Sequence, residues 1–542
     1  MTLDSPVRIT GKRYPSRRSP VLSTGGMVGA SQPLAAQAGL RMLLAGGSAA
    51  DAAVAAAAVL AVVEPMSTGI GGDVFALVYD AASNQVRALN GSGRAPAAMT
   101  LAAFQERGLQ SIPIDGMLGV TVPGTVDAWQ TLLAAHGRMS LAEVLAPAIA
   151  YARGGFPVSE IIAASWQAAT PRLQQHPDTA RIFLPGGRAP RVGEIFRQPG
   201  MAHCLQQIAE GGSDAFYRGP IAEAIVAVSE RDGGLLSLAD FATHATTWDT
   251  PISTEYRGYT IYECPPNGQG LTALLALNIL GGFDLAALEP GSPAALHLMI
   301  EAMRLAFADA AAYIADPAHA DVPTAALLAA SHTAARRALV RPDRALDLAP
   351  AGALPGGHDT VYLSVVDADG NAVSFINSIF HGFGSAVTAG DSGILLQNRG
   401  GGFVLDPSHP NCVAPGKRPY HTIIPCMALK NGRLWSSFGV MGGFMQPQGH
   451  VQMLVNMLDF GMNPQEALDA PRFELITPYQ EPKAVALEHA PAVADALAAR
   501  GHLIAERPGM FGFGGGQIIV VDEAGVRHGG SDPRKDGGIV AY

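Results

Sequence analysis

Residues 358–366 read His-Asp-Thr-Val-Tyr-Leu-Ser-Val-Val, a short polar start followed by strand-forming residues. β-Branched and aromatic residues favour strands, so a strand is predicted from Thr360 onward. The segment before it, 342–357, is rich in Pro, Gly and Ala, which is typical of a tether. The sequence therefore predicts that a new structural element begins at Thr360, directly after a tether.

This junction has a chemical interpretation. If the Asp359–Thr360 bond is cut, Thr360 gains a free α-amine beside its hydroxyl, and one residue then supplies both nucleophile and general base. The chain would be a proenzyme. The alternative is structural, because a threonine after an aspartate is also an ordinary way to begin a strand, and the spacing alone does not choose between them.

The rest of the chain predicts hairpins and buried helices. Asp369-Gly370-Asn371 is a turn signal between the strand from Thr360 and a second strand over 372–378. Further hairpins are predicted at 422–429 with 434–439 and at 517–521 with 526 onward, and helices at 32–44, 49–63, 294–315 and 449–459. Antiparallel sheets covered by helices make an α+β layered fold.

Composition excludes several classes of function. The chain has 542 residues, of which 48% are hydrophobic and 15% charged, and its net charge is -10. Without a basic run, nucleic acid is not an expected partner, and a small molecule is. The four cysteines form no C-x-x-C pair and no H-E-x-x-H occurs, so no metal and no cofactor are implied. Without an apolar run long enough for a membrane span or a signal peptide, the sequence predicts a soluble, cytoplasmic protein.

A threonine nucleophile also needs donors for the oxyanion that forms during attack. Gly442 and Gly443 end the predicted strand 434–439 and its extension, and glycine allows the backbone to approach a ligand closely. The alternative for this pair is an ordinary glycine turn or bulge.

Motifs along almost the whole chain, in the same order, resemble those of γ-glutamyltranspeptidases. They include Gly-Gly-Ser-Ala-Ala-Asp-Ala-Ala at 46–53 and Thr-Val-Tyr-Leu-Ser-Val-Val-Asp at 360–367. The other matching segments are 71–73, 122–124, 301–309, 383–385, 393–396, 415–419, 442–443, 470–473 and 531–534.

The resemblance implies an N-terminal nucleophile hydrolase with a four-layer αββα fold and two stacked antiparallel sheets. It implies self-cleavage before Thr360 into a large fragment, 1–359, and a small fragment, 360–542, which together form one domain. The partners would be these two fragments as a heterodimer, with a dimer of heterodimers as the larger assembly. Thr360 would be the nucleophile, Ser378 the hydroxyl that orients it, and Gly442 and Gly443 the oxyanion hole.

The chain departs from the family in the substrate pocket. Relatives that take γ-glutamyl compounds bind the substrate amine with an acidic residue in an Asn-(Gln/Glu)-Met-Asp-Asp-Phe segment, and here residues 398–403 read Asn-Arg-Gly-Gly-Gly-Phe. His421 and Thr422 replace the paired serines that hold the carboxylate, and Phe380 replaces an asparagine. Arg94 stands two positions from the place of the family's carboxylate-binding arginine.

These departures predict the substrate class. Without the acid, a substrate ammonium would be unpaired and would face Arg399, so an amide with a carboxylate and no amine fits better. Arg94 and Arg399 are the predicted anion-binding residues, although Arg399 could instead be a structural ion-pair residue. The sequence predicts an oxamate-like amidohydrolase. The alternatives are a γ-glutamyltransferase or glutathione hydrolase, an enzyme for another acyl amide such as a glutaryl group, and an uncleaved binding protein.

Overall fold

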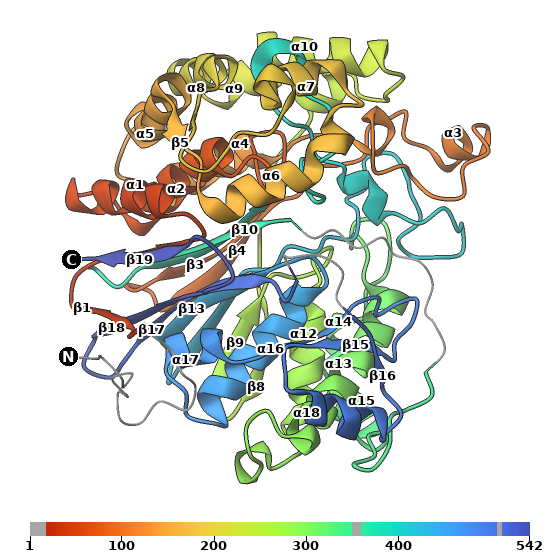
Figure 1. Ribbon diagram of the computed structural model, residues 1–542. Helices are drawn as coiled ribbons and strands as arrows, with labels where there is room; N and C mark the ends of the chain where they lie inside the picture. Colours follow the sequence, from red (N-terminus) through yellow and green to blue (C-terminus); the bar gives the residue numbers. More distant parts are fainter. Residues whose placement is uncertain (1–17, 349–358, 507–511) are drawn as a thin grey trace, which may run out of the picture.

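The computed structural model describes residues 18–348, 359–506 and 512–542. Two seven-stranded antiparallel sheets lie face to face in the middle of the molecule, with helices on both outer sides (Figure 1). This four-layer α+β arrangement confirms the predicted fold class. Most of the predicted tether, 349–357, lies outside the described residues together with His358.

The first sheet contains the strand that follows Thr360. Its order is β19-β2-β10-β11-β3-β4-β7. The strands span Gly538–Ala541 (β19), Met27–Ala30 (β2), Val361–Val366 (β10), Ala372–Ser378 (β11), Asp73–Asp80 (β3), Gln85–Gly91 (β4) and Thr247–Asp249 (β7). Strand β10 pairs with β2 on one side and β11 on the other, so the segment after the predicted cleavage bond lies inside the sheet.

The second sheet has the order β1-β18-β17-β13-β12-β9-β8. Its strands span Val21–Ser23 (β1), Arg527–Ser531 (β18), Gly515–Val521 (β17), Arg433–Met441 (β13), Cys426–Lys430 (β12), Tyr259–Glu263 (β9) and Ile252–Tyr256 (β8). Two smaller sheets complete the β-structure: β14 (Phe473–Leu475), β15 (Ala484–Leu487) and β16 (Leu503–Ile504), and β5 (Phe156–Pro157) with β6 (Ile195–Phe196).

The outer face of the first sheet is covered by helices from the first half of the chain (Figure 1). The central one, α2 (Ala49–Val63), is buried along its whole length, as its apolar sequence predicts, and the predicted capping box joins Ser48 and Asp51 at its start. Around it lie α1 (Pro33–Leu44), α4 (Thr125–His136), α5 (Leu141–Gly154), α6 (Glu160–Leu173), α7 (Pro177–Phe183), α8 (Pro199–Gly211), α9 (Ser213–Tyr217), α10 (Pro220–Arg231) and α11 (Leu238–Ala242); α3 (Leu101–Gln105) lies further out.

The outer face of the second sheet is covered by a second group of helices (Figure 1). They are α12 (Gly270–Leu280), α13 (Pro293–Tyr313), α14 (Thr324–Leu327), α15 (Ala330–Arg337), α16 (Met445–Leu458), α17 (Pro464–Asp469) and α18 (Pro491–Ala498). Among the described residues, no helix is both long enough and apolar enough to cross a membrane.

Two predicted boundaries are wrong for identifiable reasons. Helix α16 begins at Met445 rather than residue 449, because the first turn of a helix accepts a proline and Pro447 lies there. The strand expected from residue 422 begins only at Cys426. Its first residues bond elsewhere, since Ile424 N donates to the side chain of Gln446.

Candidate active site around Thr360

Strand alternation turns Thr360 toward the space between the two sheets. In β10, Val361, Leu363 and Val365 pack on the helical side, whereas Tyr362 and Val366 pack against the second sheet. Because side chains alternate along a strand, Thr360 points the same way as Tyr362. Antiparallel pairing of Val361 with Asn377 brings the next residue of β11, Ser378, beside Thr360.

Three oxygen atoms meet at the predicted cleavage bond. Thr360 Oγ1 lies 2.7 Å from the carbonyl oxygen of Asp359 and 3.2 Å from Ser378 Oγ. Ser378 Oγ donates to the same carbonyl oxygen at 3.1 Å and accepts a hydrogen bond from Phe380 N at 2.9 Å. The hydroxyl of Thr360 therefore lies beside the peptide bond that it is predicted to attack, and Ser378 bridges the two groups.

The loop after Ser378 has an unusual backbone. Phe380, Phe383 and Ala386 all have positive φ, at 80°, 60° and 59°, which is uncommon for residues other than glycine. Arg172, from α6, donates to the carbonyl oxygens of Gly382 and Gly384 and holds the loop against the helical layer. Such strain is maintained only where surrounding contacts fix it, and it clusters at functional sites.

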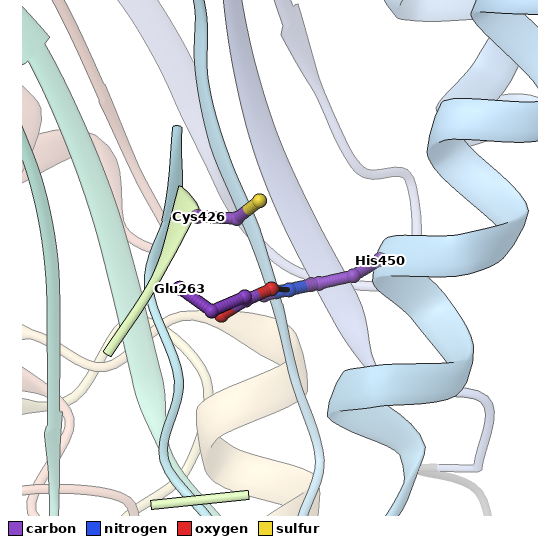
Figure 2. A group of neighbouring side chains, drawn as sticks. All are labelled: Glu263, Cys426 and His450. Carbon is purple, nitrogen blue, oxygen red and sulfur yellow. Dashed lines mark hydrogen bonds and ion pairs between the residues drawn. The ribbon is translucent and has the colours of Figure 1, made fainter. Parts of the chain in front are cut away.

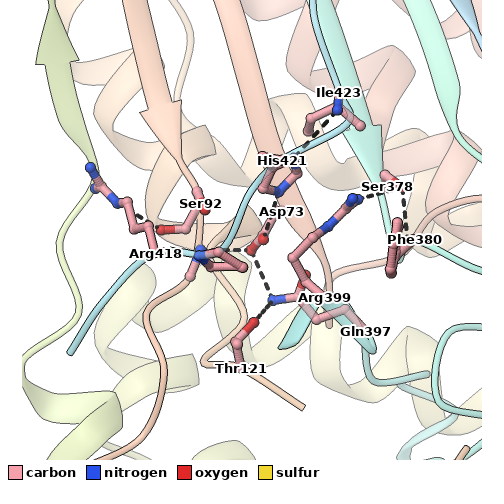
Figure 3. Close-up of polar contacts among 12 residues, drawn as sticks. Asp73, Ser92, Thr121, Ser378, Phe380, Gln397, Arg399, Arg418, His421 and Ile423 are labelled. Carbon is pink, nitrogen blue, oxygen red and sulfur yellow. Dashed lines mark hydrogen bonds and ion pairs between the residues drawn. The ribbon is translucent and has the colours of Figure 1, made fainter. Parts of the chain in front are cut away.

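Arg399 is a buried cation whose side chain points toward Ser378 (Figure 3). It opens the short helical turn η5 (Arg399–Gly402), and its Nη2 and Nη1 atoms donate to Ser378 Oγ at 3.1 Å and Thr422 Oγ1 at 2.8 Å. Its guanidinium lies 4.2 Å from the centre of the Phe380 ring. Burial lowers the pKa of Arg399 to about 9, so the group is a cation at neutral pH.

His421 faces a different partner from its neighbour Thr422. Its Nε2 atom lies 3.0 Å from Asp73 Oδ2, and both side chains are fully buried. Burial and the nearby Arg399 guanidinium lower the pKa of His421 to about 4, so it is neutral in the physiological range. A neutral imidazole with Nε2 protonated donates to the Asp73 carboxylate.

Gly442 and Gly443 lie between β13 and α16, with φ values of 124° and 62°. Their place follows from contacts between the sheets: Ser364 Oγ bonds Ser437 Oγ at 2.7 Å, and a Cβ on Gly439 would lie 2.5 Å from the Tyr362 ring. Strands β10 and β13 therefore run in opposite directions where they face each other. Going back along β10 from Ser364 to Tyr362 corresponds to going forward along β13 from Ser437 to Gly439. Thr360 therefore lies toward the end of β13, where the glycine pair follows.

Among the described residues, the Arg94 side chain forms no hydrogen bond or ion pair with the side chains around Thr360. Its Nη1 atom donates to the carbonyl oxygen of Gly416 at 3.1 Å and lies 3.7 Å from Asp316 Oδ2. The side chain is about one third exposed and lines a separate cavity of about 290 Å³ together with His244 and Asp240. Its role in anion recognition stays a prediction.

Two buried residues that organise the site, Asp73 and Gln269, were not singled out as functional by sequence reasoning. Asp73 accepts hydrogen bonds from His421, Gln397 and Gly93 N (Figure 3). Gln269 Nε2 donates to the carbonyl oxygens of Thr422 and Gly443, at 2.6 and 2.9 Å. Asp73 stands in a matched motif, but only the fold shows what these side chains hold.

Among the residues that the structure describes, two groups of potential metal ligands lie away from Thr360. In the first, Glu263 and Cys426 from the second sheet are buried beside His450 from α16, and His450 Nδ1 lies 2.7 Å from Glu263 Oε1 (Figure 2). The second consists of His297, Glu301 and His502. Neither group shares a residue with the cluster around Thr360.

Comparisons with known proteins show which family the chain resembles over its length. The family model described as Gamma-glutamyltranspeptidase matches residues 35–542. The chain is 43% identical over 526 residues to the Glutathione hydrolase-like YwrD proenzyme of Bacillus subtilis, covering 96% of this chain and 99% of that protein. It is 36% identical over 533 residues to the Oxamate amidohydrolase proenzyme of Klebsiella pneumoniae, with coverages of 96% and 99%. The solved cephalosporin acylase from Bacillus halodurans is 45% identical, with a TM-score of 0.92 and coverages of 100% and 99%.

Proposed function

Because the chain belongs to the γ-glutamyltranspeptidase family of autoprocessing amidohydrolases, we propose that it hydrolyses amides whose acyl group carries a free carboxylate and no α-amine. Oxamate, which would give oxalate and ammonia, is the simplest such amide. The nucleophile would be Thr360, freed by cleavage after Asp359.

The observation that carries this proposal is the environment of Arg399. The guanidinium is fully buried, and among the described residues no carboxylate lies within ion-pair distance of it. Its bonded partners are the neutral hydroxyls of Ser378 and Thr422. A buried charge is costly unless it is paired, so a substrate carboxylate would be favoured here and a substrate ammonium repelled.

The catalytic steps follow from the groups beside Thr360. The free α-amine accepts the proton of the Thr360 hydroxyl while the oxygen attacks the amide carbon, and the backbone N–H groups of Gly442 and Gly443 stabilise the oxyanion. The proton then passes to the leaving amine, and water hydrolyses the acyl-enzyme in the same way. With a pKa of about 7.7 to 8.0, an α-amine is partly in its basic form near neutrality.

A longer acyl chain such as glutaryl is the second candidate. The similarity to a solved cephalosporin acylase, at 45% identity over the whole chain, supports an amide larger than oxamate. Such a group also carries a carboxylate without an α-amine, so both candidates use Arg399 in the same way. A γ-glutamyl group differs from glutaryl by the ammonium alone, which makes the two a matched pair of probes.

A substrate panel on the matured protein tests the proposal. Ammonia release from oxamate is measured beside p-nitroaniline release from glutaryl- and γ-glutamyl-p-nitroanilide. We expect oxamate or the glutaryl amide to be turned over faster than the γ-glutamyl amide, and Arg399→Met to remove that preference. Faster γ-glutamyl turnover, with transfer to a dipeptide acceptor, would falsify the proposal. Arg94→Met, measured in parallel, reports whether the second arginine contributes to KM.

A denaturing gel addresses the non-enzymatic alternative. Fragments ending at Asp359 and beginning at Thr360 are expected from the purified protein. A full-length band that persists after prolonged incubation, with no turnover of any amide in the panel, would favour an uncleaved binding protein.

A further inference from the structure

Arg399 also touches the machinery of self-cleavage, through Ser378. In the uncleaved chain the substrate is the Asp359 carbonyl. The side chains of Thr360 and Ser378 both donate hydrogen bonds to its oxygen. The direction of the Ser378 proton therefore matters for self-cleavage, whichever amide the mature enzyme uses.

The hydrogen bonds around Ser378 Oγ restrict the direction of its proton. A hydroxyl oxygen has two lone pairs and one proton. Phe380 N and Arg399 Nη2 donate to this oxygen at 2.9 and 3.1 Å, and together they occupy both lone pairs. The proton must then point to an acceptor, and the carbonyl oxygen of Asp359 lies in reach at 3.1 Å. The Thr360 hydroxyl, 3.2 Å from Ser378 Oγ, has its own proton to donate and lies closer to the same carbonyl oxygen, at 2.7 Å.

We propose that Arg399 is a positioning residue for self-cleavage, which acts through Ser378 by directing and strengthening its hydrogen bond to the carbonyl oxygen of Asp359. A hydroxyl that accepts a bond from a cation becomes a stronger donor, because hydrogen bonds in a chain polarise one another. The donor is therefore strongest where negative charge develops during attack.

The chemical step balances with the groups present and one water molecule. Thr360 Oγ1 bonds to the Asp359 carbonyl carbon, and the carbonyl oxygen becomes an oxyanion held by the Ser378 hydroxyl. The Asp359–Thr360 C–N bond then breaks, and the hydroxyl proton ends on the departing nitrogen. Water hydrolyses the resulting ester, which gives a carboxylate on Asp359, a free α-amine on Thr360 and the restored hydroxyl.

Phe380 contacts both Ser378 and Arg399. Its backbone N–H bonds Ser378 Oγ, and its ring lies 4.2 Å from the Arg399 guanidinium. The positive φ of Phe380 is part of the turn that places these two groups together. Burial of Arg399 strengthens the effect, since its charge is poorly screened by water.

The test follows the rate of self-cleavage in the full-length chain after cell-free synthesis, by denaturing gel. We expect Arg399→Met to slow the appearance of the two fragments about tenfold to a hundredfold, somewhat less than the loss of a direct oxyanion donor. Arg418→Met is the matched control, because Arg418 is also a buried arginine but bonds Ser92, Asn90 and Thr247 instead of Ser378. It should cleave at the normal rate.

Two further measurements separate positioning from a folding defect. In Arg399→Gly, added guanidinium at millimolar concentration should restore part of the cleavage rate, and in Arg418→Gly it should change nothing. In the Ser378→Ala background, Arg399→Met should cause little additional loss, because its partner is already gone. Normal cleavage by Arg399→Met, or a loss that guanidinium does not restore and that adds fully to Ser378→Ala, would overturn the inference.

Discussion

Gly442 and Gly514 approach each other so closely that a Cβ on Gly442 would lie 3.0 Å from the Cα atom of Gly514. The φ of Gly442 is 124°, a value that residues with a side chain rarely adopt. The backbone conformation thus requires glycine at this position, and the close approach leaves little room for a side chain. The requirement falls on one of the two residues predicted to hold the oxyanion.

We expect Gly442→Ala to reduce kcat of the matured enzyme by about tenfold or more, since a displaced oxyanion donor costs roughly 10² to 10³ in rate. Steady-state kinetics on the preferred amide measures this effect. Gly432→Ala is the control, because Gly432 also has a positive φ, at 75°, but a Cβ there would meet nothing within 4 Å. An unchanged kcat in Gly442→Ala would contradict the assignment.

Thr360→Ala should abolish both self-cleavage and turnover, because it removes the nucleophile of both reactions. Thr360→Ser keeps the hydroxyl and should retain both at reduced rates. Intact-mass measurement detects the fragments. The appearance of a fragment beginning at residue 360 in the alanine variant would exclude Thr360 as the agent of cleavage.

Phe380→Leu should raise KM for a carboxylate-bearing amide about five- to thirtyfold, which corresponds to a cation–π contact of roughly 1 to 2 kcal/mol. The reason is that the Phe380 ring stacks on Arg399 at 4.2 Å and fixes it. Phe383→Leu is the matched control from the same loop, since Phe383 packs on Trp166 and Phe183 instead. It should lower Tm and leave KM unchanged. Equal KM values for the two variants would contradict the proposed role of the ring.

His244 should make the protein less stable in acid. Burial lowers the pKa of His244 to about 4, with Asp127 and Asp73 partly offsetting the effect, whereas the unfolded chain binds the proton at about 6.5. The stabilisation is therefore complete above pH 6.5 and is lost as the pH falls toward 4, by up to about 1.4 kcal/mol per pH unit.

Comparison of Tm at pH 7 and pH 5 with His244→Phe tests this. The variant keeps a ring for the stack on Tyr217, whose centre lies 5.2 Å from that of His244. We expect Tm of the wild type to fall more than that of the variant between the two pH values. Parallel decreases would show that His244 does not take up the proton.

Local signals were sufficient to predict much of the fold. The hairpin of β10 and β11 follows from strand-forming residues and a turn around Gly370, and α2 follows from its capping box and continuous apolar sequence. Both depend on residues that are neighbours in the chain, where pattern and structure are directly linked. The two seven-stranded sheets agree with the fold expected from the motif resemblance.

The connections within the site could not be predicted in the same way. Asp73 and His421 are separated by 348 positions, and Gln269, directly before α12, joins Thr422 to Gly443, which are distant from it in the sequence. No local pattern encodes such contacts. The replacements at Phe380 and Arg399 were visible as departures, but only the structure shows that the two side chains stack on each other.

The order of the strands has a consequence for how the protein unfolds and refolds before and after cleavage. In the first sheet, β10 and β11 of the predicted small fragment lie between β2 and β3 of the large fragment, and β19 pairs with β2 at the edge. After cleavage before Thr360, the two chains cannot separate without breaking both sheets. Loss of structure would then also be dissociation, so its midpoint would depend on protein concentration, unlike that of the precursor. The precursor can therefore fold as a single chain, whereas the unfolded mature protein can refold only if its two fragments associate again.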